Sequence, residues 1–585
     1  MAAATEDFPE IWLVDFEFRQ PDGERPQPLC LVAHEWRQKR TLRYWLEGRS
    51  ILPLPPYSYS RHSLFVAYYA SAELSCHLAL HWPLPVYVLD LFAEFRNLTN
   101  GRALLCGNSL LGALSAFGLG GLDAAEKEDM RALAIRGGPY TPSEQRALLE
   151  YCESDVVALA QLLPAMLPHV DFPRALLRGR YMKAAAHMEH AGVPVDTALL
   201  STLRQEWPTL QDALIQRIDQ QYHVYDGRSF RVDRWAQWVA RHGIPWPQLS
   251  TGQLALDKDT FRDMAYVYPS VNPMRELRAT LSELRLEKLA VGHDGRNRAM
   301  LSAFRAKTGR NQPSTNKFIF GPAKWLRHLI RPEPGYGLAY IDYEQQEFGI
   351  AAALSGDAAM LEAYQSGDPY LQFAKQAGAI PPDATRSTHE AVREQFKECA
   401  LGVQYGMGAE SLAYRIGQTP AHARALLRAH KDTYRRFWQW NTSAVDYALM
   451  ELELPTVFGW TLHVEGNVNL RTLSNFPMQA NGAEMLRLAC SLATERGIEV
   501  CAPVHDAVLI QAPSAELAHA IALTQQCMHQ ASEAVLAGYR IRTEAKPFVY
   551  PEHYQDARGI DMWQTVQGLL SAGARSVEPA MILTP

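Results

Sequence analysis

Two short apolar runs, residues 498–501 and 508–510, flank the segment Ala502-Pro503-Val504-His505-Asp506. This pattern predicts a tight antiparallel hairpin with His505 and Asp506 at or near its turn. A second acid, Asp342, stands at the end of another short apolar run, Tyr340-Ile341-Asp342-Tyr343. A single aspartate in a hairpin is as often an ordinary turn residue as a functional one. Two aspartates at the tips of buried strands are what a phosphoryl-transfer site with two divalent metals needs.

Length and composition describe an ordinary globular chain. The 585 residues are enough for about three or four domains, and 47% of them are apolar and 21% charged. The sequence has no apolar run of about 18 residues and no signal-peptide pattern at its acidic start. The eight cysteines form no CxxC pair and fall mostly within apolar runs. These features predict a reduced, cytoplasmic protein without a membrane partner.

Charge is unevenly distributed along the chain. Residues 1–171 hold 14 Lys and Arg against 21 Asp and Glu, whereas residues 274–328 hold 12 basic residues against 4 acidic ones. The basic stretch is a candidate phosphate-contacting strip, although a solvated helix face would have the same composition. Its members include Arg296, Arg298, Arg305, Lys307, Arg310, Lys317 and Lys324.

Hydrophobic periodicity divides the chain into an α/β region, a helical region and a mixed region. The first has predicted strands at 11–18, 28–34 and 86–89, a helical stretch near 71–81 and a strong helix at 144–163. Long amphipathic runs follow at 174–190, 197–219 and 274–290. Further strands are expected near 338–342, 456–464, 499–504 and 508–512. We place the domains at residues 1–172 and 173–585, and divide the second near residue 300.

A set of acids recurs in the first region. Asp15 and Glu17 alternate along a strand and so project from one face, and Tyr151 and Asp155 share one face of a helix. Glu73 lies between these two pairs in the sequence. Together the acids can hold two Mg²⁺ ions while the tyrosine hydroxyl orients a water for phosphodiester hydrolysis. A surface acid is the alternative reading for each of them.

The ordered set DxE, a central acid and YxxxD resembles the DEDD-type 3′–5′ proofreading exonucleases with the Tyr variant of the third motif. The resemblance implies that Asp15, Glu17, Glu73 and Asp155 bind the metals and that Tyr151 assists. Glu73 stands where that family has Asp, and Tyr69 stands where it has Asn. Asp90, which follows the next strand, is the alternative second-motif acid.

The segment LAYIDYEQQEFG resembles motif A of family A DNA polymerases. The resemblance implies that Asp342 is a metal ligand, helped by the backbone carbonyl of Tyr343. It also places Gln345 and Glu347 at the incoming dNTP, with Glu347 blocking a 2′-OH. Gly349 replaces the arginine that ends the family's pattern.

REQFKECALGVQYGMG resembles motif B of the same family, about 50 residues further on. Arg393 and Lys397 lie one helical turn apart, so both cations can grip one triphosphate. The resemblance places Tyr405 at the templating position. Leu401 stands where the family has an aromatic residue that contacts the nucleotide sugar, which makes Tyr405 the candidate support for Glu347.

Other segments agree with this resemblance. VHDA resembles motif C, with His505 and Asp506 matched and Ala507 in place of a glutamate. KTGRNQPS resembles the TGR element near the primer terminus and implies that Arg310 reads the minor groove. RTLSNFPMQANGAE carries Arg471, Asn475 and Gln479 at the spacing of the family's template-primer contacts.

The chain is thus identified as a member of family A, with an α/β multidomain fold. We expect an N-terminal ribonuclease H-like 3′–5′ exonuclease domain, followed by a palm, fingers and thumb polymerase domain. Expected partners are primer-template DNA, dNTPs and a single-stranded 3′ end, with two Mg²⁺ per site or Mn²⁺ instead. With a strand predicted at residue 11, we expect no 5′ nuclease domain, as in a compact phage-like enzyme. The rival hypotheses are a nuclease-dominated repair protein and a non-catalytic primer-template binding factor.

Overall fold

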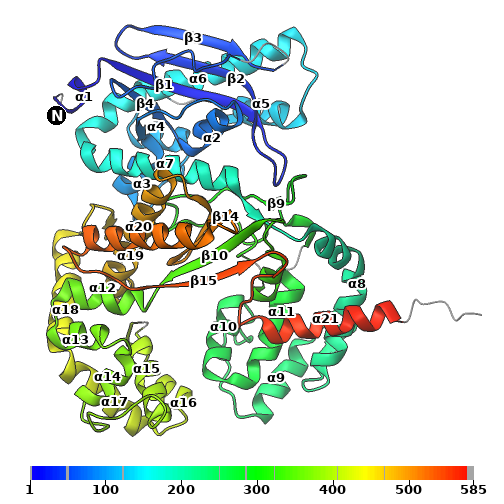
Figure 1. Ribbon diagram of the computed structural model, residues 1–585, viewed down its shortest axis with the longest axis vertical. Helices are drawn as coiled ribbons and strands as arrows, with labels where there is room; N and C mark the ends of the chain where they lie inside the picture. The colour runs from blue at the N-terminus through cyan, green and yellow to red at the C-terminus, as the bar shows by residue number, and fades with distance from the viewer. Residues whose placement is uncertain are drawn as a thin grey trace, which may run out of the picture.

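The computed structural model describes residues 3–47, 52–120, 124–249, 251–283, 286–321, 323–404, 406–466 and 468–575. An N-terminal α/β part lies at the top of Figure 1, a second sheet lies at the centre, and two helical lobes lie below it. No helix within these ranges is long and apolar enough to cross a membrane.

The N-terminal part is built on a five-stranded sheet in the order β3-β2-β1-β4-β5. β1 pairs antiparallel with β2 and parallel with β4, and β4 pairs parallel with β5. Its strands are β1 (Glu10–Arg19), β2 (Gln27–Glu35), β3 (Arg40–Trp45), β4 (Ser63–Ala67) and β5 (Tyr87–Asp90). Its helices are α1 (Ala3–Glu6), α2 (Ser71–Ala79), α3 (Leu91–Thr99), α4 (Leu110–Ala116), α5 (Ala124–Arg136) and α6 (Pro142–Met166).

Helix α6 carries two of the predicted site residues and packs against β1 and β2. It begins at a capping box, in which Thr141 accepts from the Glu144 backbone N–H and the Glu144 side chain accepts from the Thr141 N–H. Its buried face presents residues such as Leu148, Leu159 and Leu162 to the sheet. This face fixes the rotation of the helix, and with it the direction of the side chains near β1.

Helix α7 (Phe172–Ala191) joins the two sheets. It packs against α2 and β5 on one side and against α19 (Leu470–Glu495) and β13 (Glu499–Val504) on the other. Gly179 allows this approach, because a Cβ there would lie 1.8 Å from the carbonyl oxygen of Val88. The helix therefore packs against elements on both sides of residue 172, where the sequence analysis placed the domain boundary.

The central sheet has the order β13-β14-β10-β15 and is antiparallel throughout. Val504 pairs with Ala507 across a two-residue turn at His505 and Asp506, which confirms the predicted hairpin. Asp342 pairs with Ala507 on the neighbouring strand. The other strands are β10 (Tyr336–Tyr343), β14 (Ala507–Pro513) and β15 (Thr543–Val549). Helices α19 and α20 (Leu517–Val535) pack against this sheet.

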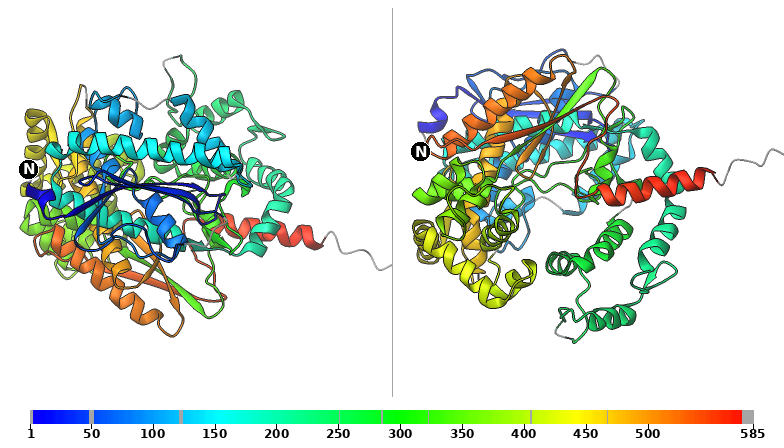
Figure 2. Two further views of the ribbon diagram at one scale, coloured as in Figure 1. Left: turned by 90° about the horizontal axis from the view of Figure 1, so that it is seen from above. Right: turned by 60° about the horizontal axis from the view of Figure 1, so that its bottom comes forward.

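The two helical lobes lie apart beneath the central sheet in both Figure 1 and the right view of Figure 2. One contains α12 (Gln346–Ser355), α13 (Ala358–Gln365), α14 (Pro369–Gln376), α15 (Glu390–Gln404), α16 (Ala409–Arg415), α17 (Pro420–Thr433) and α18 (Arg435–Glu451). The other contains α8 (Thr197–Asp219), α9 (Val232–Arg241), α10 (Lys258–Val267), α11 (Asn272–Glu283) and α21 (Ile560–Arg575). The core of the second lobe, with Trp235 and Trp325 fully buried, continues to Leu509 and Phe548 of the central sheet.

Some elements differ from the sequence expectations. β3, β4 and β15 were not predicted; β3 and β15 carry charged residues such as Arg43 and Lys546 and lie at sheet edges, where the apolar alternation is weak. The single strand predicted at 456–464 is a hairpin of β11 (Glu453–Pro455) and β12 (Thr461–His463). Its turn includes Gly459 with φ +76°. Of the helix predicted at 274–290, α11 covers the residues up to Glu283, and Leu286–Lys288 form a 3-10 helix.

Candidate active sites

Asp342 and Asp506 meet at one end of the central sheet. Asp342 lies near the end of β10, and Asp506 lies in the β13–β14 turn, where His505 has φ +59°. The Tyr343 backbone N–H donates to the Asp506 carbonyl oxygen at 3.4 Å, which ties the two segments together. The Tyr343 ring is buried and its hydroxyl donates to the Met528 carbonyl oxygen at 2.7 Å. Sheet pairing therefore brings together two acids that are 164 positions apart in the sequence.

Burial disfavours the ionised form of both carboxyl groups. Burial, followed by the charge of Asp506, raises the pKa of Asp342 to about 7. Burial also raises the pKa of Asp506 above its usual range. Asp342 Oδ1 is buried and accepts no hydrogen bond within the described ranges. Two partly desolvated carboxylates with an unsatisfied oxygen are a fitting donor set for Mg²⁺, which prefers oxygen ligands.

Glu347 lies on the first turn of α12, next to this pair. Arg310 approaches it with 3.6 Å between Nη2 and Oε1, and burial raises the pKa of Glu347. The sequence analysis predicted that Tyr405 supports the Glu347 side chain, but Tyr405 lies outside the described residues. The ion pair with Arg310 was not foreseen, because the two residues belong to separate motifs.

Arg393 and Lys397 lie on α15, where the sequence predicted them. Arg393 Nε donates to Asp368 Oδ2 at 2.6 Å, and Arg393 also pairs with Glu394. Lys397 Nζ donates to Glu394 Oε2 at 2.9 Å. The two cations are thus held by carboxylates that phosphate oxygens could replace. Leu401 is partly buried one turn further along the helix.

Gln345 adopts a left-handed conformation, with φ +45°, just before α12. Arg542 of the loop before β15 donates from Nη2 to Gln345 Oε1 at 3.0 Å and from Nε to Glu344 Oε2 at 3.1 Å. Sequence reasoning missed Arg542, since it lies in no motif. The structure also explains why glycine is present at position 349. A Cβ there would lie 2.5 Å from Ile541 Cδ1, so a larger residue would require that side chain to move.

Arg471, Asn475 and Gln479 recur every four residues on α19 and so share one face. Arg471 lies against Gly406, where a Cβ would be 2.6 Å from the arginine Nε. α19 therefore meets the loop that follows α15. The asparagine and the glutamine are partly buried.

A cavity of about 530 Å³ opens between the second lobe and the central sheet. Arg310 and His505, for which the sequence predicts DNA contacts, both line it. Basic residues of the second lobe and of the segment after it also line the cavity, and the sequence analysis named only Lys324 among them. These residues are Lys258, Arg262, Arg275, Lys324 and Arg327.

Two members of the basic strip have other partners. Arg296 is buried and pairs with Glu333 at 2.7 Å and with Glu499 at 2.9 Å. Arg298 is buried and pairs with Asp294 at 2.6 Å. Both arginines hold backbone and carboxylate groups of the protein, so they do not belong to a phosphate-contacting surface.

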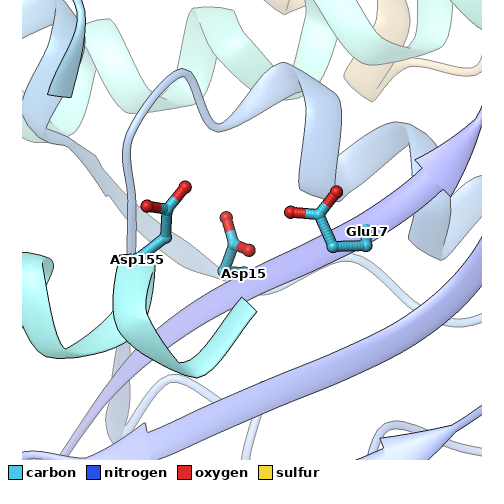
Figure 3. Close-up of side chains that lie close together, drawn as sticks. All are labelled: Asp15, Glu17 and Asp155. Carbon is cyan, nitrogen blue, oxygen red and sulfur yellow. The ribbon is translucent and has the colours of Figure 1, made fainter. Parts of the chain in front are cut away.

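A second acidic cluster lies in the N-terminal part. Asp15 and Glu17 project from β1 and Asp155 from α6, and all three carboxylates point into one space (Figure 3). One oxygen from each lies within 4.8 Å of the others. The Tyr151 hydroxyl approaches Asp155 Oδ2 at 3.5 Å. Three carboxylates this close form a donor set that fits a divalent cation.

Glu73 is a buried neighbour of this cluster. Its carboxyl lies in the first turn of α2, and burial followed by the charge of Asp15 raises its pKa well above the usual range. Its Oε2 has no hydrogen-bond partner within the described ranges. An unsatisfied, buried carboxylate oxygen beside three other acids is the arrangement expected of a ligand.

Asp90 has a different environment. It caps α3 and accepts from four backbone N–H groups, those of Phe92 at 2.8 Å, Tyr69 at 3.0 Å, Ala70 at 3.1 Å and Ala93 at 3.4 Å. Burial raises its pKa to about 7, against these hydrogen bonds. Its oxygens are thus occupied in holding β5, α3 and the residues before α2.

We expect Asp90→Ala to lower the free energy of unfolding by about 1–3 kcal/mol, because it leaves buried N–H groups without an acceptor. Chemical denaturation followed by circular dichroism measures this loss. Asp90→Asn keeps one accepting oxygen and should lose less. Equal stability of wild type and Asp90→Ala would contradict the capping role.

Comparisons with known proteins find similarity mainly in the C-terminal half of the chain. The model of DNA polymerase family A matches residues 270–545. DNA polymerase I of Thermus thermophilus is 25% identical over 381 residues, 60% of this chain and 45% of the relative. DNA polymerase I of Deinococcus radiodurans is 26% identical over 379 residues, 58% and 38% of the two chains. The chain thus spans less than half the length of these two relatives.

A DNA polymerase of Mycobacterium phage L5 is 26% identical over 217 residues, which cover 37% of this chain and 34% of the relative. Among solved structures, the POL domain of Pol1 from M. smegmatis, in complex with DNA primer-template and dNTP, aligns with a TM-score of 0.66. It has 17% identity and covers 93% of this chain and 96% of its own. This likeness confirms the expected α/β polymerase fold.

Proposed function

We propose that this chain, whose residues 270–545 match the model of DNA polymerase family A, extends DNA primers on a template and removes 3′-terminal nucleotides at a second site. The observation that carries the polymerase proposal is the meeting of Asp342 and Asp506 at adjacent strand ends, with raised pKa values. The four acids near β1 and the nearby Tyr151 support the exonuclease proposal.

At the polymerase site, Asp342 and Asp506 would hold Mg²⁺, together with the Tyr343 carbonyl. Bound Mg²⁺ would activate the primer 3′-OH and neutralise charge on the phosphates. Arg393 and Lys397 would orient the triphosphate by exchanging Asp368 and Glu394 for phosphate oxygens.

The primer-template would lie along the basic cavity and the face of α19 that carries Arg471, Asn475 and Gln479. Arg310 and His505 line the cavity, and Arg471 begins the α19 face. Minor-groove acceptors are shared by all correct base pairs, so contacts of this kind test the shape of a pair and not its sequence.

At the exonuclease site, Asp15, Glu17, Glu73 and Asp155 would hold Mg²⁺ or Mn²⁺. The Tyr151 hydroxyl would orient the attacking water, because it lies beside Asp155. A single-stranded 3′ end is the expected substrate, since a paired end would have to be unwound first.

A primer-extension assay tests the proposal directly. The purified chain, a labelled primer on a longer template, the four dNTPs and Mg²⁺ should give products of template length. The same primer without dNTPs should be shortened from its 3′ end. Binding of primer-template without either reaction would favour the non-catalytic binding factor instead.

Glu347→Ala should raise ribonucleotide relative to deoxyribonucleotide incorporation by roughly 10-fold or more, the scale of one lost steric or hydrogen-bonding discrimination. The carboxylate lies beside Asp506 and is held by Arg310, so it can occupy the space of a 2′-OH. Single-nucleotide kinetics with rNTP and dNTP measure the ratio.

Glu347→Gln is the matched control, because it keeps the shape and removes the charge that attracts Arg310. Unchanged selectivity in this control would assign the gate to shape alone. Unchanged selectivity in Glu347→Ala would place the sugar gate elsewhere.

A further inference from the structure

The loop before Arg310 has a backbone that needs external support. Ser302 and Phe304 have φ values of +50° and +58°, in the left-handed region that side chains other than glycine rarely adopt. Gly309, directly before Arg310, has φ +73°. Such conformations persist only when surrounding contacts hold them.

Part of this support comes from helix α3 of the N-terminal part. Arg96 donates from Nε to the Phe304 carbonyl at 3.4 Å and from Nη2 to the Arg305 carbonyl at 3.0 Å. Asn100, which follows α3 and is fully buried, donates from Nδ2 to the Lys307 carbonyl at 2.7 Å. Two side chains of the first part thus donate to three backbone carbonyl groups of this loop.

The remaining support comes from the polymerase part. Trp460 Nε1 donates to the Lys307 carbonyl at 2.9 Å, and Arg487 Nη1 donates to the Gly309 carbonyl at 2.6 Å. Asn100 also donates to the Thr461 carbonyl at 2.9 Å, so it joins the loop to the β11–β12 hairpin. The Lys307 carbonyl oxygen therefore accepts hydrogen bonds from both parts of the molecule.

Arg310 follows immediately and points to the proposed polymerase site. It pairs with Glu347, and its charge acts on Asp506. Its Nε is buried and has no hydrogen-bond partner within the described ranges. A displacement of the loop would therefore move a cation that lies beside both the basic cavity and the acid pair.

We propose that Arg96 and Asn100 are positioning residues of the polymerase reaction, which hold the 304–309 loop so that Arg310 meets the primer terminus. The proposal rests on the polymerase function proposed above. It makes helix α3, which lies in the exonuclease part, a working component of the primer-binding surface.

Steady-state primer extension by the full chain tests this role. Arg96→Gln and Asn100→Ala should each raise KM for primer-template by roughly 10- to 100-fold, the range expected for a displaced positioning group. Degradation of a single-stranded 3′ end should stay at the wild-type rate in both variants. This second activity also reports that the N-terminal part is folded.

Asn97→Ala is the matched control. Asn97 lies on the same helix and makes two hydrogen bonds across the same interface, to the Gly459 carbonyl at 3.0 Å and from the Thr461 N–H at 2.8 Å. Both contacts are to the β11–β12 hairpin and not to the 304–309 loop. Wild-type KM in Asn97→Ala would separate positioning of the loop from general docking of the two parts.

Combination with Arg310→Ala distinguishes positioning from a structural role. If Asn100 acts through Arg310, the double variant should have the KM of Arg310→Ala alone, because the two losses are not additive. Additive losses, or equal KM values in Asn100→Ala and Asn97→Ala, would overturn the inference.

If Asn100→Ala does not fold, the variants Arg96→Gln and Arg96→Lys decide the question. Arg96→Lys should then show a smaller rise in KM than Arg96→Gln. A wild-type chain that cannot extend primers would instead refute the proposed function.

Discussion

Asp342→Asn or Asp506→Asn is expected to lower the rate of primer extension by at least ~100-fold, the scale of losing one strong electrostatic contact to a transition state. Each substitution keeps the shape of the side chain and removes the charge that would hold Mg²⁺. The physical reason is that two carboxylates, brought together at adjacent strand ends, are the oxygen ligands proposed for the cation. Primer-template affinity, measured by fluorescence anisotropy, should change little, since neither aspartate is a cation that contacts phosphate.

Asp446→Asn is the matched control for this prediction, because it removes the same charge from an exposed position on α18. It should extend primers like the wild type. Degradation of a single-stranded 3′ end should persist in both active-site variants, since we propose the N-terminal cluster for that chemistry. Near-wild-type extension by Asp342→Asn would refute the assignment of the polymerase site.

The second large effect is expected at the N-terminal cluster. Asp15→Ala combined with Glu17→Ala should reduce degradation of a single-stranded 3′ end by at least ~100-fold and leave primer extension intact. Removing two of three carboxylates whose oxygens lie within 4.8 Å of one another leaves too few ligands for a divalent cation. A time course with a 3′-labelled oligonucleotide measures the loss.

Glu73→Ala should behave like this double variant, and Asp90→Ala should keep its activity once its lower stability is taken into account. The structural difference is that Glu73 has an unsatisfied buried oxygen, whereas Asp90 accepts from four backbone N–H groups. An active Glu73→Ala beside an inactive, stable Asp90→Ala would reverse the assignment of the second-motif acid.

Local patterns in the sequence were sufficient to predict several features of the two sites. Alternation along a strand places Asp15 and Glu17 on one face, and helical spacing places Tyr151 and Asp155 on another. The apolar runs around His505 and Asp506 predict the hairpin that the β13–β14 pairing confirms. These features depend on residues close in sequence, so periodicity alone can reveal them.

Contacts between distant segments could not be predicted in this way. The pairing of Arg310 with Glu347, the grip of Arg542 on Gln345 and the bridge from Asn100 to the Lys307 carbonyl each join separate parts of the chain. The edge strands β3 and β15 were also not predicted. An edge strand can carry charged residues, so its apolar and polar residues alternate less regularly than those of a buried strand.

The sequence by itself therefore determined many of the helices and strands and the acids that they present. Only the tertiary structure decided which acids share a site, which basic residues remain available to a ligand, and which are used internally. Arg296 and Arg310 illustrate the difference, since both belong to the same basic stretch. Arg296 is buried between two glutamates, whereas Arg310 lines the cavity beside the acid pair. The distribution of charged residues along the chain can be seen in the sequence. Whether each charged side chain is buried depends on packing among residues that lie far apart in the chain.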